Sequence, residues 1–293
     1  MQTIHTIEAL RTARARLRGR LALVPTMGAL HEGHLTLVRE AKARAAHVVV
    51  SIFVNPRQFG ANEDLDAYPR QLERDCAALE PLGVDIVWAP SAAEMYPAGY
   101  TTNVSVSGVS EGLCGAARPG HFDGVATVVC KLFNQVRPDL ALFGEKDWQQ
   151  LAVIRRMARD LDLAYPADID GSPTVREPDG LALSSRNAYL SSEDRVRAAI
   201  LPAAMKKAIA EISGGKPVAE ALNRLTAALL SGGFASVDYA ELRDAESLAL
   251  LTEHPTDFAR LLVAARIGST RLIDNMEAWS GYNLERVRGI EPL

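Results

Sequence analysis

The chain has 293 residues, of which 48% are hydrophobic and 23% are charged, a composition typical of a globular protein with a sizeable core and room for two domains. Its net charge of −4 argues against a broad nucleic-acid-binding surface. No apolar run approaches the ~18 residues of a membrane-spanning helix. Three cysteines without a Cys-x-x-Cys pair indicate free thiols in a reducing compartment, so we expect a cytoplasmic protein without membrane partners.

The arginine-rich N-terminus predicts a solvated helix rather than a targeting segment. Ile7, Leu10 and Leu17 indicate one apolar face of a helix. The apolar run that follows is broken early, at Pro25 and Gly28, which is unlike a signal peptide.

The segment after this helix predicts a buried strand followed by a helix. Four apolar residues, Leu21–Val24, indicate the strand, and we expect Pro25 to end it. The helix is expected to begin near His34 and to direct Leu35, Val38 and Ala41 to the interior.

Strands and helices continue to alternate through the first half of the chain. Further strands are predicted at Val48–Val54, Val84–Trp88 and Asp139–Phe143. Helices are predicted at Leu72–Leu82, at Val125–Val136 with Asp123 as its N-cap, and around Leu151–Leu161. Such alternation indicates βαβ units and an α/β fold with a Rossmann-like parallel sheet, which binds ligands at the carboxyl ends of its strands.

Prolines and glycines crowd residues 165–180, and we place a domain boundary near residue 174. The first domain would then span 1–174 and a smaller α+β domain 175–293. In the second domain helices are predicted at Glu193–Ile212 and Val218–Leu230, and strands at Ser236–Leu242, Leu261–Ile267 and Thr270–Ile273. The tail 279–293 has no clear period and is assigned no role.

His31 and His34 occupy the expected strand-to-helix junction, where unpaired backbone N–H groups and the helix dipole suit a phosphate chain. Two alternatives stay open for these histidines alone. They could bind zinc, although the sequence offers no third and fourth ligand at a convincing spacing, or they could simply cap a helix. The segment is neither a Walker A loop nor a dinucleotide fingerprint.

Four later segments carry polar side chains that suit a nucleoside triphosphate and an organic acid. These segments are Asn55–Phe59, Arg118–Gly124, Gly144–Asp147 with Gln150, and Leu183–Asn187. Lys146 and Arg186 supply cations for phosphate oxygens, and Ser184 and Ser185 supply hydroxyl donors.

The remaining polar groups in these segments suit a metal ion and an acid. Asp147 or Asp75 could lie near Mg²⁺, which commonly binds one or two carboxylates together with phosphate. Gln58 and Gln150 are neutral amides, which would bind a substrate carboxylate without quenching it as a nucleophile.

Five ordered motifs make the chain similar to the pantoate–β-alanine ligase (pantothenate synthetase) family. The motifs are Pro25-Thr-Met-Gly-Ala-Leu-His-Glu-Gly-His34, Phe53-Val-Asn-Pro-Arg-Gln-Phe59, Arg118-Pro-Gly-His-Phe122, Phe143-Gly-Glu-Lys-Asp147 with Gln149-Gln150, and Asp179-Gly-Leu-Ala-Leu-Ser-Ser-Arg-Asn187. Arg57 stands in the variable position of the second motif, where an apolar residue is more usual.

The resemblance implies an ATP-dependent ligase that condenses pantoate with β-alanine. The pantoate carboxylate would attack the α-phosphorus of ATP, and pyrophosphate would leave. The β-alanine amine would then attack the pantoyl-adenylate and give pantothenate and AMP. The resemblance also implies Mg²⁺, a homodimer, and no nucleic-acid partner.

By the same resemblance, His31, His34, Lys146 and Arg186 are catalytic, and His34 donates a proton to the departing pyrophosphate. Gln58 would contact both pantoate and β-alanine, and Gln150 would hold pantoate. The residues implied to bind ATP are Met27, Gly28, Ala29, Leu30, His31, Glu32, Gly33, His34, Gly144, Glu145, Lys146, Asp147, Val175, Leu183, Ser184, Ser185 and Arg186.

Two other functions stay open at this stage. A different adenylyl- or cytidylyltransferase on the same fold would use the histidines and Lys146 but would not recognise pantoate. A nucleotide-binding regulator would bind ATP without turnover, although both glutamines and the full set of lysine, serines and arginine argue against it.

Overall fold

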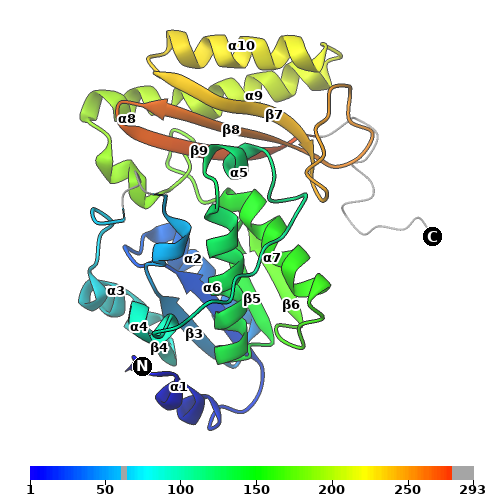
Figure 1. The fold of residues 1–293 in the computed structure, drawn as a ribbon. Helices are drawn as coiled ribbons and strands as arrows, with labels where there is room; N and C mark the ends of the chain where they lie inside the picture. Colours follow the sequence, from blue (N-terminus) through cyan, green and yellow to red (C-terminus); the bar gives the residue numbers. More distant parts are fainter. Residues whose placement is uncertain (61–64, 279–293) are drawn as a thin grey trace, which may run out of the picture. The chain divides into compact units, whose positions relative to one another are not determined.

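The computed structural model describes residues 1–60 and 65–278 and divides the chain into two compact units, 1–175 and 176–293 (Figure 1). The described part of the first unit contains a sheet of six parallel strands in the order β1-β4-β3-β2-β5-β6. The strands are β1 (Gln2–Ile4), β2 (Leu21–Thr26), β3 (His47–Ile52), β4 (Ile86–Trp88), β5 (Leu140–Gly144) and β6 (Asp168–Ser172). The predicted Rossmann-like parallel sheet is thereby confirmed.

Helices connect these strands and cover the sheet (Figure 1). On one face Leu37, Val38 and Ala41 of α2 pack with Ala22 and Val24 in one buried cluster. The helices of this unit are α1 (Ile7–Arg14), α2 (Glu32–Arg44), α3 (Leu72–Leu79), α4 (Ala92–Met95), α5 (Leu113–Ala117), α6 (His121–Val136) and α7 (Trp148–Asp160). Short 3-10 turns lie at η1 (Pro56–Gln58), η2 (Glu80–Leu82) and η3 (Glu145–Asp147).

The strand order reverses at β2, because β3 and β4 lie on one side of it and β5 and β6 on the other. In an open parallel sheet the crevice outside the carboxyl ends of the strands at such a reversal is the usual ligand site. The segment after β2 and the segment after β5 both start at this point, so the topology brings residues 27–34 and 144–147 to one edge of the sheet.

Several elements of this unit differ from the sequence predictions. Helix α2 begins at Glu32 with His31 as N-cap, rather than near His34. Helix α6 begins at His121 after Gly120, so Asp123 lies in its first turn and does not cap it. Strand β6 falls within the Pro- and Gly-rich stretch that was read only as a boundary, and β1 was not predicted.

Strand β2 does not end at Pro25 but continues to Thr26. The Leu21 carbonyl accepts from the Asp139 N–H. The main-chain N–H and C=O groups of alternate residues, starting at Leu21, therefore point toward β5. Pro25 lies on that side, beyond Leu23, the last residue of β2 that pairs with β5. The N–H that proline lacks is therefore not needed in the ladder.

In the second unit two long helices pack against an antiparallel sheet, which confirms the predicted α+β character. Its strands β7 (Ser236–Asp244), β8 (Ala259–Ile267) and β9 (Thr270–Ala278) pair in that order. Its helices are α8 (Ser192–Ala198), α9 (Ile200–Ser213) and α10 (Val218–Ser231), and η4 spans Ser185–Tyr189. The single helix predicted over 193–212 is therefore interrupted at Ala199.

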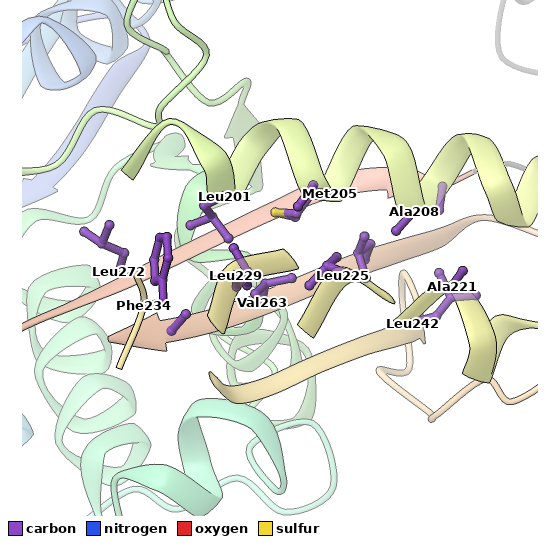
Figure 2. Close-up of a cluster of buried hydrophobic side chains, with 14 of the residues drawn as sticks. Leu201, Met205, Ala208, Ala221, Leu225, Leu229, Phe234, Leu242, Val263 and Leu272 are labelled. Atoms are coloured by element: carbon purple, nitrogen blue, oxygen red, sulfur yellow. The ribbon is translucent and has the colours of Figure 1, made fainter. Parts of the chain in front are cut away.

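The core of this unit lies between the helices and the sheet (Figure 2). Met205 of α9 and Leu229 of α10 are fully buried, together with Val263 of β8. The cluster contains alternate residues of β8, such as Leu261, Val263 and Ala265, as expected for one face of a strand.

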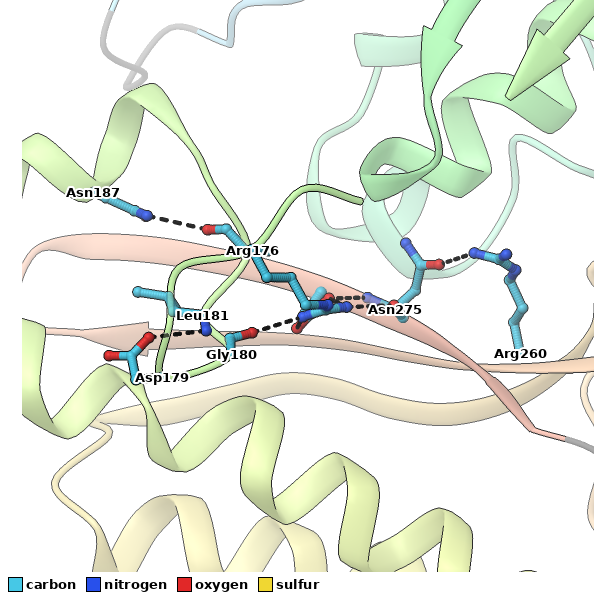
Figure 3. A network of polar contacts seen from close by, with 9 residues as sticks. Arg176, Asp179, Gly180, Leu181, Asn187, Arg260 and Asn275 are labelled. Atoms are coloured by element: carbon cyan, nitrogen blue, oxygen red, sulfur yellow. Dashed lines mark hydrogen bonds and ion pairs between the residues drawn. The ribbon is translucent and has the colours of Figure 1, made fainter. Parts of the chain in front are cut away.

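A buried ion pair anchors the start of this unit to its sheet. The Arg176 guanidinium donates to both carboxylate oxygens of Asp274 on β9, at 2.7 and 2.9 Å, and the Asp274 side chain is 1% exposed (Figure 3). Arg176 also donates to the carbonyls of Gly180 and Asn275, at 3.0 and 3.2 Å. The turn that leads to Leu183–Arg186 is thus fixed on β9.

In the part of the chain that the structure describes, no helix is both long and apolar enough to cross a membrane. Cys76, Cys114 and Cys130 form no disulfide, as their spacing predicted.

We expect Arg176→Ala to lower the free energy of unfolding by about 3 kcal/mol, because removing one partner leaves the Asp274 carboxylate buried without its cation. Denaturant titration monitored by circular dichroism measures the loss. Arg195→Ala is the control, since its ion pair with Asp179 is partly exposed, with side chains 31% and 37% accessible. Equal losses in both variants would show that burial of the Arg176 pair does not matter.

Candidate active site

The loop from β2 to α2 turns sharply at Gly28 and Ala29. Their φ angles are +83° and +52°, so two successive residues adopt the left-handed region, which only glycine enters without strain. The Asp75 carboxylate of α3 accepts hydrogen bonds from the N–H groups of Ala29 and Leu30, at 3.0 and 2.9 Å. A Cβ on Gly28 would approach Asp75 Oδ2 to 2.9 Å, so position 28 has no room for a side chain.

Asp75 therefore holds the loop rather than offering its oxygens to Mg²⁺, which was one of the two sequence-based possibilities. Its side chain is 2% exposed, and each oxygen already accepts a backbone N–H. Burial raises the pKa of this carboxyl although both hydrogen bonds favour the ionised form. Of the two aspartates considered for Mg²⁺, Asp147 therefore remains the candidate.

His31 and His34 form a reciprocal cap at the start of α2. The His31 Nδ1 accepts from the Gly33 N–H at 3.2 Å, and the His34 Nδ1 accepts from the His31 N–H at 3.3 Å. A neutral imidazole with an accepting Nδ1 carries its proton on Nε2. Both rings therefore present an Nε2–H donor, and their centroids lie 4.1 Å apart. The two histidines do cap a helix, as one alternative held, and this capping also orients two N–H donors.

Burial keeps the two imidazoles neutral. It lowers the pKa of His34 to about 3, and the neighbouring His31 adds to this effect. Burial lowers the pKa of His31 as well, and Lys146 contributes in the same direction. Both imidazoles are therefore neutral hydrogen-bond donors at neutral pH.

Lys146 and Asp147 follow β5 and lie near the histidines. The Lys146 Nζ is 3.9 Å from Asp147 Oδ1, and the lysine side chain is only 19% exposed. Both residues act on the pKa of His34, the carboxylate raising it and the ammonium lowering it. Val175 lies beside the same loop, with its Cβ 3.9 Å from where a Cβ on Gly33 would stand.

Gln58 is fixed on the other side of β2. Its Nε2 donates to the Met27 Sδ at 3.2 Å, and its Oε1 accepts from Asn55 Nδ2 at 3.0 Å. Its main-chain carbonyl accepts from the His121 Nδ1 at 2.8 Å and from Arg118 at 3.3 Å. The Arg118–Gly124 motif thus anchors the backbone that carries Gln58.

The two glutamines at the start of α7 have different environments. Gln149 is buried, accepts from the Cys114 N–H at 3.0 Å, and donates to the carbonyls of Val109, Glu111 and Gly112 at 3.2 to 3.3 Å. Gln150 is half-buried in the same turn. Gln149 therefore fixes the loop 109–114, and only Gln150 suits the predicted ligand role.

Within the first unit the structure thus brings together Met27–His34, Gly144–Asp147 and Val175, with Gln58 touching Met27. Leu183–Arg186 belongs to the second unit, where the Ser184 hydroxyl accepts from the Arg186 N–H and caps η4. Three structural roles were not predicted from the sequence: Asn55 holds Gln58, Gln149 holds the loop 109–114, and Asp75 holds the loop after β2.

No group of three or more His, Cys, Asp or Glu side chains is arranged to hold a metal ion among residues 1–60 and 65–278. The zinc alternative for His31 and His34 gains no support there, and the Nδ1 atom of each ring is already engaged by a backbone N–H.

Comparison with known proteins decides the family. The sequence matches the family described as pantoate-beta-alanine ligase over residues 2–277. The chain belongs to the pantoate–β-alanine ligase family. A pantothenate synthetase of Novosphingobium aromaticivorans is 67% identical over 281 residues, covering 94% of this chain and 98% of the relative. The resemblance inferred from the five motifs, and the ligase it implies, are confirmed.

Solved structures agree over nearly the whole fold. Pantothenate synthetase from Thermus thermophilus matches with a TM-score of 0.88 at 49% identity, covering 95% of this chain and 100% of that one. Pantoate-beta-alanine ligase from Francisella tularensis, complexed with beta-gamma ATP and beta-alanine, matches with a TM-score of 0.79 at 35% identity over 96% of this chain and 99% of that one.

The depressed pKa of His34 predicts a pH-dependent stability. Above pH 6.5 neither the folded nor the unfolded state protonates this histidine. Between 6.5 and about 3 the unfolded chain binds a proton that the folded chain refuses, so the free energy of unfolding falls as pH falls.

We therefore expect the stability difference between wild type and His34→Gln to shift in favour of the variant by up to about 1.4 kcal/mol per pH unit below 6.5. Urea titrations at pH 7.5, 6 and 5 measure the difference. A difference that does not change with pH would show that His34 titrates alike in both states.

Proposed function

We propose that this chain joins pantoate to β-alanine in two steps at the edge of the parallel sheet. The pantoate carboxylate attacks the α-phosphorus of ATP and releases pyrophosphate, and the β-alanine amine then attacks the carbonyl of the pantoyl-adenylate and releases AMP. One observation carries the proposal. Lys146 follows β5 and Gln58 follows β3, on opposite sides of β2, while two neutral imidazole donors follow β2 itself and the fixed Gln58 amide contacts Met27.

The phosphate side of this site is built to accept negative charge. The Nε2–H groups of His31 and His34 and the Lys146 ammonium supply donors where charge accumulates as pyrophosphate leaves. A bound triphosphate raises the pKa of a neighbouring imidazole, because an opposite charge favours the protonated form. His34 is then able to donate a proton to the leaving pyrophosphate.

The acid side uses neutral groups. The Gln58 amide presents its N–H groups beside Met27, and Gln150 lies in the first turn of α7. Amide donors bind a carboxylate without the strong charge pairing of an arginine fork, so the carboxylate keeps more of its nucleophilicity. Holding the carboxylate and the α-phosphorus in line supplies a further part of the rate.

The second unit is assigned part of the ATP site in the same proposal. Leu183, Ser184, Ser185 and Arg186 carry hydroxyl and guanidinium donors that suit phosphate oxygens. We propose residues 1–174 as the domain that binds ATP and pantoate, and 175–293 as the smaller domain that contributes these donors and covers the adenylate against water.

Mg²⁺ would accompany the nucleotide. Asp147, whose side chain is 46% exposed beside Lys146, is the carboxylate of this site that could reach it. Most of the ligands would be phosphate oxygens and water, as is common for Mg²⁺ on nucleotides. A homodimer in a reducing, cytoplasmic compartment completes the proposal, supported by the family and by the lack of a disulfide among the three cysteines.

The decisive experiment is exchange of labelled pyrophosphate into ATP. We expect exchange with ATP, Mg²⁺ and pantoate, because the first step is reversible, and none when pantoate is left out. Adding β-alanine should convert the mixture to pantothenate and AMP, identified by mass. Exchange without pantoate would favour another nucleotidyltransferase, and ATP binding by calorimetry without AMP release would favour a regulator.

Gln150→Ala should weaken the binding of pantoate more than the binding of ATP. We expect the KM for pantoate to rise about tenfold, as for the loss of one or two hydrogen bonds, with the KM for ATP within about twofold. Steady-state rates and the thermal midpoint measure both effects.

Gln149→Ala is the comparison for that variant, because it leaves the Cys114 N–H and three carbonyls without their partner. It should lower the thermal midpoint, which Gln150→Ala should leave almost unchanged. Equal losses of affinity for pantoate and ATP in Gln150→Ala would reduce Gln150 to a structural residue.

A further inference from the structure

The Asn55 side chain uses its full hydrogen-bonding capacity within the protein. Its Oδ1 accepts from the Tyr96 hydroxyl at 2.8 Å and from the Arg57 N–H at 3.3 Å. Its Nδ2 donates to the Gln58 Oε1 and to the Gly124 carbonyl, both at 3.0 Å. An amide has two donors and two acceptor sites, so Asn55, 1% exposed, is fully satisfied.

These partners leave one orientation for the Asn55 amide. The Arg57 N–H can only donate and the Gly124 carbonyl can only accept, so Oδ1 must face the first and Nδ2 the second. Because Oδ1 accepts, the Tyr96 hydroxyl has to be the donor. Burial raises the pKa of Tyr96, which keeps that proton in place at any working pH.

The orientation of Asn55 then determines that of Gln58. Since Nδ2 of Asn55 donates, the Gln58 oxygen must face it, and the Gln58 NH₂ group must point the other way, toward Met27. A flipped Gln58 would place two NH₂ groups against each other. Asn55 thereby sets which end of its amide Gln58 offers to a ligand.

The backbone around Asn55 is equally constrained. A Cβ on Gly124 would lie 2.3 Å from the Arg57 carbonyl oxygen and 2.7 Å from the Gln58 Cα, so α6 packs directly on η1. This close approach brings the Gly124 carbonyl to Asn55 and leaves the pair little room to move.

Tyr96 itself is held by aromatic and cationic neighbours. Its ring centroid lies 5.1 Å from that of Tyr100 and 6.2 Å from that of Phe53. The Arg57 guanidinium carbon lies 5.5 Å from the Tyr96 centroid and 5.4 Å from the Tyr100 centroid. Arg57, the unusual residue of its motif, thus stacks over both rings and donates to the Asn103 side chain at 3.1 Å.

We propose that Tyr96 is a positioning residue for substrate binding: main-chain groups set which way the Asn55 amide faces, the Tyr96 hydroxyl bond at 2.8 Å helps to hold that amide in place, and Asn55 fixes which end of the Gln58 amide faces the acid substrate. Arg57 contributes twice, by its N–H to Asn55 and by holding the Tyr96 ring. In this proposal Tyr96 acts through Asn55 and Gln58 and has no contact of its own with the substrate. The inference rests on the proposed function, in which Gln58 contacts pantoate.

Tyr96→Phe tests this directly, and Tyr100→Phe is the matched control. Phenylalanine keeps the ring and its aromatic and cationic contacts and removes only the hydroxyl. Tyr100 lies in the same cluster, and no described residue donates to or accepts from its hydroxyl. Initial rates are measured with pantoate varied at saturating ATP and β-alanine, then with ATP varied, and thermal midpoints are recorded for both variants.

We expect Tyr96→Phe to raise the KM for pantoate about tenfold, with the KM for ATP within about twofold and the thermal midpoint within a few degrees. Tyr100→Phe should match wild type in both constants. Equal behaviour of the two variants, or a parallel rise of both KM values in Tyr96→Phe, would overturn the positioning role. Failure of pantoate-dependent pyrophosphate exchange in the wild type would instead overturn the proposed function.

Discussion

The carboxylate of Asp75 holds the turn on which the phosphate side of the site is built. Left-handed backbone at a residue such as Ala29 costs roughly 1–2 kcal/mol, so the turn would relax if nothing opposed it. Each hydrogen bond from a backbone N–H to an ionised carboxylate contributes about 1.5–3 kcal/mol, and Asp75 accepts two of them. The two bonds outweigh the strain, and α2 starts where His31 and His34 can cap it.

Buried polar groups fix the position of this turn and of the neighbouring segments of the site. Asp75 acts on the loop after β2, Asn55 on Gln58, and Gln149 on the loop before α5. Each is nearly inaccessible and bonded to main-chain groups, so each has one orientation at low cost. The exposed parts of the site are thereby positioned before any ligand is present, which is the condition for electrostatic stabilisation of a transition state.

The sequence predicted the elements whose periodicity is strong, and several of its candidate site segments lie together in the first unit. The apolar runs of β2, β3 and β5 and the stripe of α6 were found because burial on one or two faces dictates residue type. Strand β6 was missed because Asp168–Ser172 is polar and lies at the sheet edge, where its one neighbour is β5. The start of α2 was misplaced because His31 caps through its ring, which is not one of the usual capping residues.

The residues behind the site could not be predicted for a different reason. Asn55 and Asp75 carry polar side chains whose partners lie far away in sequence, such as Gly124 and Ala29, and nothing in local periodicity indicates such pairs. Gln149 stood beside Gln150 in one motif, yet the helix turns by about 100° between them, and only the three-dimensional structure shows which one faces the loop 109–114. Arg57 became intelligible only once Tyr96 and Tyr100 lay beneath it.

The distribution of charge across the first unit's site follows from the proposed chemistry. A carboxylate that must attack phosphorus has to be held but not neutralised, whereas a departing pyrophosphate needs its charge compensated. Lys146 lies near the two imidazoles, and the Gln58 amide, with no formal charge of its own, contacts Met27 and follows β3, on the opposite side of β2 from the strand that precedes Lys146. Placing a cation beside Gln58 would bind the acid in its ground state more strongly and leave less of that binding for the transition state. Arg118, a cation in contact with Gln58, donates to its main-chain carbonyl and to the His121 ring, so part of its guanidinium is already engaged by the protein. These bonds direct part of the Arg118 guanidinium to the main chain and to the His121 ring, while the neutral Gln58 amide is the group that contacts Met27.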